Sequence, residues 1–269
     1  MKKNKITNEN NPGLIENIHK RQSQNLALLI ELDEICRKNN LYYSVAYETA
    51  LGAVREHKFI DWDGDVDVFI SLETYQFLLK NYPNRLITSK IKHHMYQFPR
   101  FIKENDIDTN NPNSSYIDMF VLVPTTTKKA THYVRSLWNK MEAAQASAQR
   151  TTYFKHKVGW WTLKILTHLF MFWIPRLTIE KAQNKVLETA KPEILFAVSW
   201  PTYSHDFKYQ WQLPLNYMEH TKDIEINDHI FKINSDIEKH LANWYGDNWR
   251  IPIKSNKAIF YGYYECYKK

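Results

Sequence analysis

The chain of 269 residues is 43% hydrophobic and 14% aromatic, which excludes a disordered polymer and provides enough apolar side chains for a core. Its net charge is +7, and residues 128–176 carry nine basic residues against one acidic residue, so the rest of the chain sums to −1. Two cysteines exclude a disulfide framework and a zinc knuckle, and the lack of glycine-rich phosphate-loop patterns argues against a Rossmann or P-loop nucleotide site.

The first half of the chain alternates predicted helices and strands. Residues 1–12 are polar and are expected to form a loose tail; they lack the apolar stretch of a signal peptide, so we expect a cytoplasmic protein. Apolar residues then recur at spacings of three and four over residues 14–39, which predicts an amphipathic helix that ends at Asn39-Asn40. Further along the chain we expect a strand at 41–47, a helix at 49–55, a strand at 65–70, a helix at 72–81, weaker strands at 86–89 and 95–102, and a strong strand at 116–123 that ends at Pro124.

The second half reads mainly as helices. They are predicted at 130–149, 158–172, 178–188 and 236–245, with a mixed segment that includes 224–233. The sequence thus predicts a mixed α/β half followed by a mainly helical half, with a boundary near residues 125–128.

Four aspartates occupy alternate positions at the strand predicted over 65–70: Asp61, Asp63, Asp65 and Asp67. Alternate side chains of a strand share one face, so the later carboxylates would project together and would repel one another. Oxygen-only ligands suit a hard cation such as Mg²⁺ or Mn²⁺, so the pattern predicts a metal site. A solvated aspartate-rich turn is the alternative. An EF-hand loop is excluded because no glutamate follows at its twelfth position.

Asp118 interrupts the apolar strand at 116–123. A buried aspartate needs a partner, either a metal shared with the aspartate row or a hydrogen-bonding loop.

Gly52 lets backbone or ligand approach closely. Thr49 starts the helix predicted at 49–55, where hydroxyl and amide groups can contact phosphate, and Arg55 can offset phosphate charge. Together these are the parts that metal-dependent phosphoryl transfer needs.

These residues resemble the motifs of the LicD family of phosphotransferases, which includes the fukutin-type proteins. The family pattern has glycine and serine or threonine before leucine-leucine-glycine-alanine-valine-arginine, then phenylalanine-isoleucine-proline-tryptophan and an alternating aspartate cluster. The matching segments here are ETALGAVR at 48–55, FIDWDGDVD at 59–67, IDMF at 117–120 and NWYGDNW at 243–249, followed by Pro252. Glu48 stands where the family has glycine, and Asp61 where it has proline.

The resemblance implies an α+β fold with a nucleotidyltransferase-like mixed β-sheet core over residues 13–127, flanking helices, and a mainly helical, basic and aromatic half over 128–269. It implies a cytoplasmic enzyme that transfers phosphocholine, or a related phospho-alcohol, from CDP-choline or a related CDP-alcohol. The acceptor would be a hydroxyl of a bacterial cell-surface glycan precursor such as teichoic acid or lipopolysaccharide, in a lipid-linked form, with release of CMP. The implied cofactor is Mg²⁺ or Mn²⁺.

We expect the catalytic residues to be Asp65, Asp67 and Asp118, with Asp63 completing the metal ligands. Asp118 would bind a second ion or accept the proton of the acceptor hydroxyl. The candidates for substrate binding are Glu48, Thr49, Arg55, Tyr47 and Trp62. The last two could present ring faces to a quaternary ammonium, which has no hydrogen-bond donor.

The run at 158–174 is the most apolar of the chain. Lys164 and His168 interrupt it and Pro175 ends it, so we do not expect it to span a membrane. Its basic flanks and terminal tryptophans favour contact of residues 158–176 with an anionic membrane surface. The alternative is a core helix with basic neighbours in solvent.

Two other functions remain open. A true nucleotidyltransferase shares the paired acidic strands, but it would leave the nucleotide on a small molecule or protein. A non-catalytic basic protein could bind a membrane surface. We expect no nucleic-acid partner, because no recognisable motif is present. His93-His94 has no companion ligand at a useful spacing and is expected at the surface.

Overall fold

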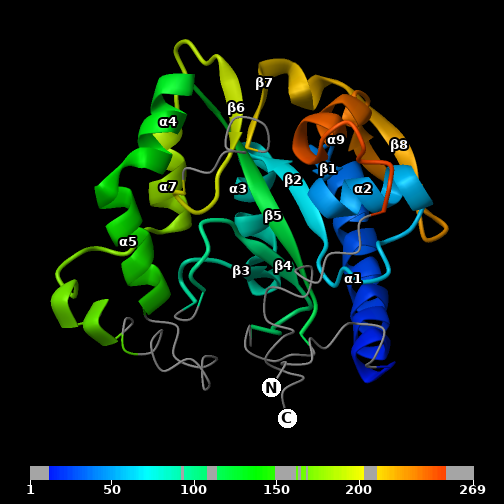
Figure 1. The fold of residues 1–269 in the computed structure, drawn as a ribbon, viewed down its shortest axis with the longest axis horizontal. Helices are drawn as coiled ribbons and strands as arrows, with labels where there is room; N and C mark the ends of the chain where they lie inside the picture. The colour runs from blue at the N-terminus through cyan, green and yellow to red at the C-terminus, as the bar shows by residue number, and fades with distance from the viewer. Residues whose placement is uncertain are drawn as a thin grey trace, which may run out of the picture.

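A mixed β-sheet forms the centre of the computed structural model, which describes residues 12–91, 94–107, 114–148, 162, 165–167, 169–202 and 211–252 (Figure 1). Its strands run in the order β1-β2-β5-β4-β3, and β6 and β7 continue from β5. β2 and β5 are parallel, and the other pairs are antiparallel. The fold is therefore α+β with a mixed sheet, as expected. The strands are β1 (Tyr43–Val45), β2 (Asp67–Ser71), β3 (Leu86–Ile87), β4 (Arg100–Ile102), β5 (Tyr116–Thr125), β6 (Ile194–Ala197) and β7 (Gln212–Pro214).

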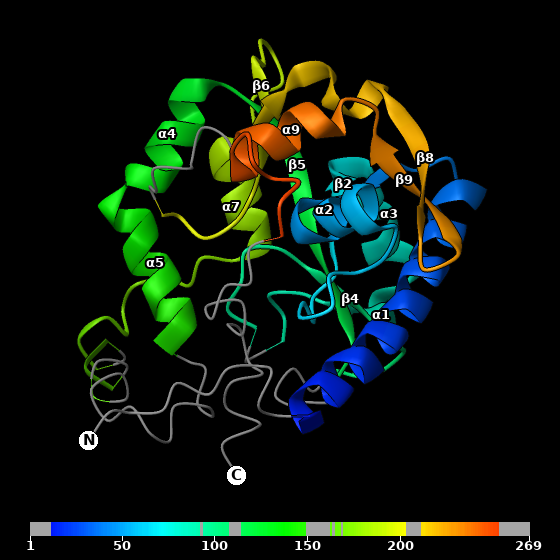
Figure 2. The same cartoon turned by 45° about the vertical axis from the view of Figure 1, so that its right-hand side comes forward.

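Helices cover both faces of this sheet. Figure 1 shows α2 and α9 side by side in front of β2, and α3 behind the central strands. α1 passes along the edge next to β8 (Thr221–Ile226) and β9 (His229–Asn234), and α4, α5 and α7 group at the opposite end beside β5 and β6 (Figure 2). The helices are α1 (Pro12–Lys38), α2 (Tyr47–Glu56), α3 (Leu72–Asn81), α4 (Thr127–Arg135), α5 (Leu137–Ala148), α7 (Ile179–Val186) and α9 (Ile237–Tyr245), with 3₁₀ turns η2 (Pro83–Arg85) and η3 (Leu215–Glu219).

Two predicted boundaries are wrong for local reasons. The strand expected to end at Pro124 continues to Thr125, because the ladder with β6 pairs Thr125 with Ile194 and the Glu193 N–H donates to the Thr125 carbonyl at 2.8 Å. The helix expected over 130–149 is two helices. The backbone leaves the helix at Ser136, whose hydroxyl accepts the Asn139 N–H at 3.3 Å near the start of α5.

The second half is more mixed than expected. It supplies β6 and β7 to the central sheet, so this sheet crosses the boundary expected near residues 125–128. It also contains the hairpin of β8 (Thr221–Ile226) and β9 (His229–Asn234). Asn227 and Asp228 take positive φ values of 50° and 64°, which a tight type I′ hairpin requires.

Residues 158–161, 163, 164 and 168 of the apolar run at 158–174 lie outside the described residues. Within its described part Ile174 is buried, but the larger apolar side chains before it face solvent, so a core helix is wrong for these residues. The exposed ones are Ile165, Leu166, Leu169, Phe170, Phe172 and Trp173. Where the structure describes helices, none is long and apolar enough to cross a bilayer.

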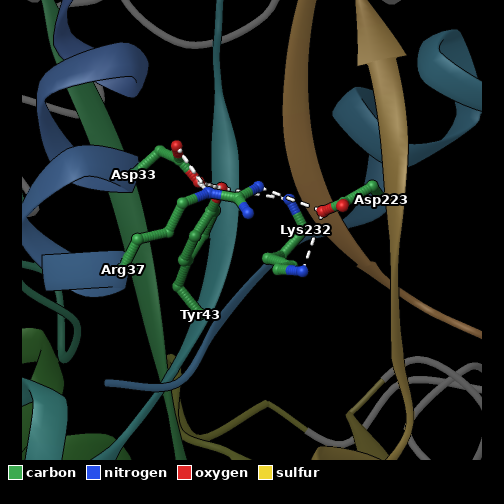
Figure 3. A network of polar contacts seen from close by, with 5 residues as sticks. All are labelled: Asp33, Arg37, Tyr43, Asp223 and Lys232. Atoms are coloured by element: carbon green, nitrogen blue, oxygen red, sulfur yellow. Dashed lines mark hydrogen bonds and ion pairs between the residues drawn. The ribbon is translucent and has the colours of Figure 1, made fainter. Parts of the chain in front are cut away.

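A polar network joins α1, β1 and the β8–β9 hairpin (Figure 3). Arg37, near the end of α1, bonds Asp33 at 2.7 Å and Asp223 of β8 at 3.1 Å. Asp223 also pairs with Lys232 of β9 at 2.8 Å. The Tyr43 hydroxyl donates to Asp33 and accepts the Lys232 N–H, the latter at 3.0 Å. These bonds fix the hairpin, and with it the start of α9, against the first helix.

His240 on α9 should make the stability of the protein depend on pH. Its ring is 7% exposed and lies 4.8 Å from Tyr217 and 5.8 Å from Trp244. Burial lowers the pKa of His240 to about 4. Between pH 6.5 and 4 the histidine binds its proton in the unfolded chain and not in the folded one, so the contribution of His240 to stability falls as pH falls, by up to ~1.4 kcal/mol per pH unit.

Urea unfolding at pH values across this window measures the effect. His240→Gln cannot titrate, so its free energy of unfolding should depend less on pH than that of the wild type. His229→Gln, which changes an exposed histidine of β9, should keep the wild-type slope. Equal slopes for the wild type and His240→Gln would contradict the prediction.

Candidate active site

The pairing of β2 with β5 places Asp67 beside Asp118. The two residues are direct partners in the parallel register, so their side chains lie on the same face of the sheet. The Asp118 N–H donates to the Val66 carbonyl at 2.9 Å, which fixes this register. Aspartates 51 positions apart in the sequence thus meet where the two strands begin, as the sequence predicted.

The other aspartates lie in a loop before β2, not in the strand expected from residue 65. Asp61 is exposed and pairs with Lys58 at 2.6 Å. Asp63 and Asp65 are partly exposed, and the Asp65 N–H donates to Asp63 Oδ1 at 3.2 Å. The alternate spacing therefore places Asp63 and Asp65 near the strand start without making them part of the ladder.

Two polar side chains of α1 hold this loop in place. The amide of Gln22 donates to the carbonyls of Ile60 at 2.8 Å and Asp63 at 2.7 Å. Asn25, fully buried, donates to the Gly64 carbonyl and accepts the Tyr116 N–H, each at 3.0 Å. Asn25 thereby joins the aspartate loop to the start of β5. Nothing in the helical pattern of α1 marked these two residues.

The carboxylates raise one another's pKa. Desolvation and then Asp118, Glu48, Asp65 and Asp63 raise the pKa of Asp67 well above its usual value. Desolvation, with Asp65 and Glu48 next, does the same to the pKa of Asp63. Oδ1 of Asp65 is buried without a hydrogen-bond partner. Uncompensated carboxylates in a poorly hydrated site favour either protons or a cation.

A hard divalent cation fits this donor set, because all donors are oxygens and one of them is an unpartnered buried atom. The carboxylates stand apart in the structure: among the described residues no group of three or more His, Cys, Asp or Glu side chains is gathered closely enough to hold a metal ion. The chemistry of the site thus matches the expected metal, and the ligand set is not preformed.

Arg100 of β4 is the partner of Asp118. Its Nε lies 2.6 Å from Asp118 Oδ1, and both side chains are almost buried. The guanidinium also lies 3.7 Å from the ring centroid of Tyr116, whose ring stacks under Arg21 of α1 at 4.5 Å. Desolvation raises the pKa of Asp118, and Arg100 opposes that rise. Arg21 also opposes the rise in the pKa of Asp63, so both arginines offset part of the negative charge of the carboxylates.

The start of α2 closes over the same strand. The Asp67 N–H donates to the Thr49 hydroxyl at 2.9 Å, and the Ala46 N–H donates to the Asp67 carbonyl at 2.9 Å. Tyr47 has a positive φ of 44°, a conformation that a bulky residue adopts only under constraint. Thr49 is thus a bonded neighbour of Asp67, whereas Arg55, at the other end of α2, bonds Glu56 at 2.8 Å.

Gly52 permits the close approach of α2 to the loop that follows it. A Cβ at this position would lie 2.5 Å from the Lys58 carbonyl oxygen and 3.1 Å from the Ile60 nitrogen. Alanine would normally gain about 1 kcal/mol over glycine in a helix. We expect Gly52→Ala to lower the free energy of unfolding instead, by about 1–3 kcal/mol, because backbone must move. A thermal melt measures whether Gly52→Ala lowers the melting temperature. A raised melting temperature would show that the close approach to the Lys58 carbonyl does not require glycine.

Glu48 lies on this helix with its side chain exposed. The protein around it nevertheless desolvates it and raises its pKa, and a hydrogen bond from the Tyr245 hydroxyl opposes that rise. Tyr245 belongs to the segment at 243–249, so α9 brings this segment to the start of α2. Trp244 beside it packs on Tyr47, with ring centroids 5.2 Å apart.

The two aromatic candidates differ in exposure. Tyr47 is 9% exposed and packs against Phe69 and Phe120, with centroids 5.1 and 5.0 Å away. Most of its ring is therefore occupied by the core. Trp62 is partly buried against the same core and retains more solvent contact.

The expectation that His93-His94 lies at the surface is wrong for His94. This side chain is 3% exposed, and its Nε2 lies 2.7 Å from the Phe98 carbonyl oxygen, so the bond to the backbone compensates its burial. His93 lies outside the described residues.

Two comparisons with known proteins agree with this geometry. Residues 40–158 match the family model described as LicD/FKTN/FKRP, nucleotidyltransferase domain. The chain is also 20% identical over 253 residues to the lipopolysaccharide cholinephosphotransferase LicD of Haemophilus influenzae, which covers 88% of this chain and 94% of that protein. The family match spans β1 to β5 and includes the aspartate loop and Asp118. Residues 40–158 therefore resemble a nucleotidyltransferase domain of the LicD family.

Proposed function

We propose that this protein is a phosphotransferase that moves phosphocholine from CDP-choline to a hydroxyl of a cell-surface glycan precursor and releases CMP. Lipopolysaccharide and teichoic acid precursors are the candidate acceptors. The observation that carries the proposal is the register of β2 with β5, which places Asp67 beside Asp118 next to the aspartate loop. The family domain and the name of the Haemophilus relative support the choice of phosphocholine.

Asp65 and Asp67 would hold the principal divalent ion, Mg²⁺ or Mn²⁺, with Asp63 completing its ligands. When bound, the ion would neutralise negative charge on the donor diphosphate and on the departing CMP. The unpartnered Oδ1 of Asp65 and the mutual repulsion of the carboxylates support this assignment.

Asp118 would accept the proton of the acceptor hydroxyl. The acceptor oxygen then forms a bond to the phosphorus that carries choline, the bond from that phosphorus to the bridging oxygen breaks, and CMP leaves with the electron pair. Arg100 bonds Oδ1 of Asp118 at 2.6 Å, whereas its other contact, Nη2 to Oδ2, is longer at 3.5 Å. Oδ2 is thus the oxygen better able to take the proton.

Glu48 would face the quaternary ammonium of choline. A carboxylate beside the phosphates would repel them, but toward a cation the same charge is favourable. The bond between Tyr245 and Glu48 holds this carboxylate at the edge of the site, and Trp62, next to Asp63 in the chain, offers a partly exposed ring. Thr49 would position Asp67 through its backbone bond.

Product analysis tests the reaction. The protein is incubated with Mg²⁺, a crude glycan acceptor fraction and CDP-choline labelled either in choline or in cytidine. We expect the choline label in the glycan and an equal amount of free CMP. Cytidine label in the acceptor would instead identify a true nucleotidyltransferase. CDP-glycerol and CDP-ribitol serve as matched donors, and their preferential use would overturn choline as the transferred alcohol.

The same proposal includes a lipid-linked acceptor and peripheral contact with the inner face of the cell membrane. The net charge of +8 over residues 128–176 supports an anionic surface as that contact.

A further inference from the structure

An apolar surface lies at the end of the molecule that carries α5. We call it the aromatic face, and it consists of Leu137, Trp138, Leu169, Phe170, Phe172 and Trp173. Phe170, Phe172 and Trp173 are 72%, 73% and 61% exposed, and Leu137 is 71% exposed. Isolated exposed apolar side chains are ordinary, but a contiguous group of large ones marks an interaction surface.

Two separate segments form the aromatic face. The rings of Trp138, at the start of α5, and Trp173 lie 6.1 Å apart, so the two segments meet. The second segment is anchored to α5, because Ile174 is buried and the Leu177 N–H donates to the Glu142 carbonyl at 3.1 Å. The exposed rings therefore project from a fixed base.

The stretch of sequence that contains the aromatic face is strongly basic. Residues 128–176 contain nine basic residues, and their single acidic residue is Glu142. Glu142 is 3% exposed and pairs with Lys185 at 2.9 Å, so it presents no negative charge to solvent. Arg135 and Lys140, which flank Leu137 and Trp138 on the chain, are exposed. A partner must accept apolar rings and supply negative charge next to them.

We infer that the aromatic face docks on an anionic lipid bilayer, with its rings at the level of the headgroups and its basic residues on the lipid phosphates. Aromatic side chains with adjacent Lys and Arg are favoured at this interface. A second copy of the chain would bring two faces of like charge together. The chain's own ends beyond the described residues are basic as well, with Lys2, Lys3 and Lys5 at one end and Lys268 and Lys269 at the other. Charge complementarity thus favours the bilayer.

This inference deepens the proposed function, because it names the surface that would bring the enzyme to a lipid-linked acceptor. Vesicle binding requires neither donor nor turnover. The two proposals can therefore fail separately.

Sedimentation with vesicles tests the inference. The full chain is mixed with vesicles of phosphatidylcholine alone or with about 30% phosphatidylglycerol. We expect binding to the anionic vesicles that weakens with added salt. Phe170→Ser/Trp173→Ser should bind roughly tenfold or more weakly, since each buried aromatic contributes more than a kilocalorie per mole. Lys140→Glu should weaken binding to anionic vesicles only.

Leu215→Ser/Ile230→Ser is the matched control, because these apolar side chains are 42% and 52% exposed at η3 and β9. It should bind like the wild type. Leu169→Ser/Phe172→Ser provides a second variant should the first fail to fold by circular dichroism. No binding of the wild type, or equal binding of folded aromatic-face variants, would overturn the inference. Light scattering that shows a dimer lost in these variants, without vesicle binding, would assign the face to a second copy.

Discussion

Asp67→Asn is expected to abolish transfer and to leave the protein at least as stable as the wild type. The substitution removes a proposed metal ligand, so turnover should fall about a thousandfold or more. It also removes one negative charge from a cluster in which desolvation and the neighbouring carboxylates, Asp118 first, raise the pKa of Asp67. Relief of that repulsion should keep or raise the melting temperature measured in EDTA. Release of CMP from CDP-choline measures the turnover.

Asp61→Asn is the control for this experiment. It makes the same chemical change six positions away in the same row of aspartates, but Asp61 is exposed and pairs with Lys58 outside the cluster. Its turnover should stay within about twofold of the wild type, because exposed ion pairs contribute little. Retained turnover in Asp67→Asn would contradict the assignment of Asp67 as a metal ligand. A large drop in its melting temperature would show that Asp67 has a structural role instead.

Arg100→Met should destabilise the protein by about 3–5 kcal/mol, because it leaves the buried Asp118 without its counter-charge. The Nε–Oδ1 contact is 2.6 Å and both side chains are almost completely buried, so removal of one partner leaves an uncompensated buried charge. Urea unfolding of the single variants and of Arg100→Met/Asp118→Asn forms a double-mutant cycle. The double variant should recover much of the lost stability, since it removes both charges.

The control is Arg250→Met. Arg250 pairs with Glu238 and lies 4.2 Å from the ring centroid of Trp249, so it has the same types of contact as Arg100. Both members of this pair are more than half exposed, and the loss should be within about 1 kcal/mol. Equal costs for Arg100→Met and Arg250→Met would mean that Asp118 finds compensation elsewhere.

Local sequence signals predicted the elements that local interactions define. The helix at 72–81 was predicted with its observed bounds, because an apolar period follows Ser71, whose side chain accepts the Thr74 N–H as an N-cap. The meeting of Asp67 and Asp118 was also predicted, since a metal shared with the aspartate row would compensate the buried carboxylate of Asp118.

The features that the sequence did not predict, the loop position of Asp63 and Asp65 and the partner of Asp118, depend on contacts between residues far apart in the chain. Asp63 and Asp65 leave the strand because Gln22 and Asn25 hold their loop, and these bonds join residues about forty positions apart. Arg100 carried a usable signal, since it is a charge within the apolar run before residue 102, just as Asp118 is within its own. Matching the two would have identified the ion pair.

The region that matches the family model should not fold on its own, because the network of Arg37, Asp223, Lys232 and Tyr43 joins residues outside it to β1. Residues 40–158 contain the paired aspartates. They lack α1, which holds the aspartate loop, β6, which pairs with the end of β5, and the β8–β9 hairpin, which precedes α9. A fragment cut to those limits would leave an open sheet edge and a bare apolar face. The described segments before residue 40 and after residue 158 must therefore pack on the middle before the proposed site is complete, so the excised region should be inactive as well as prone to aggregate.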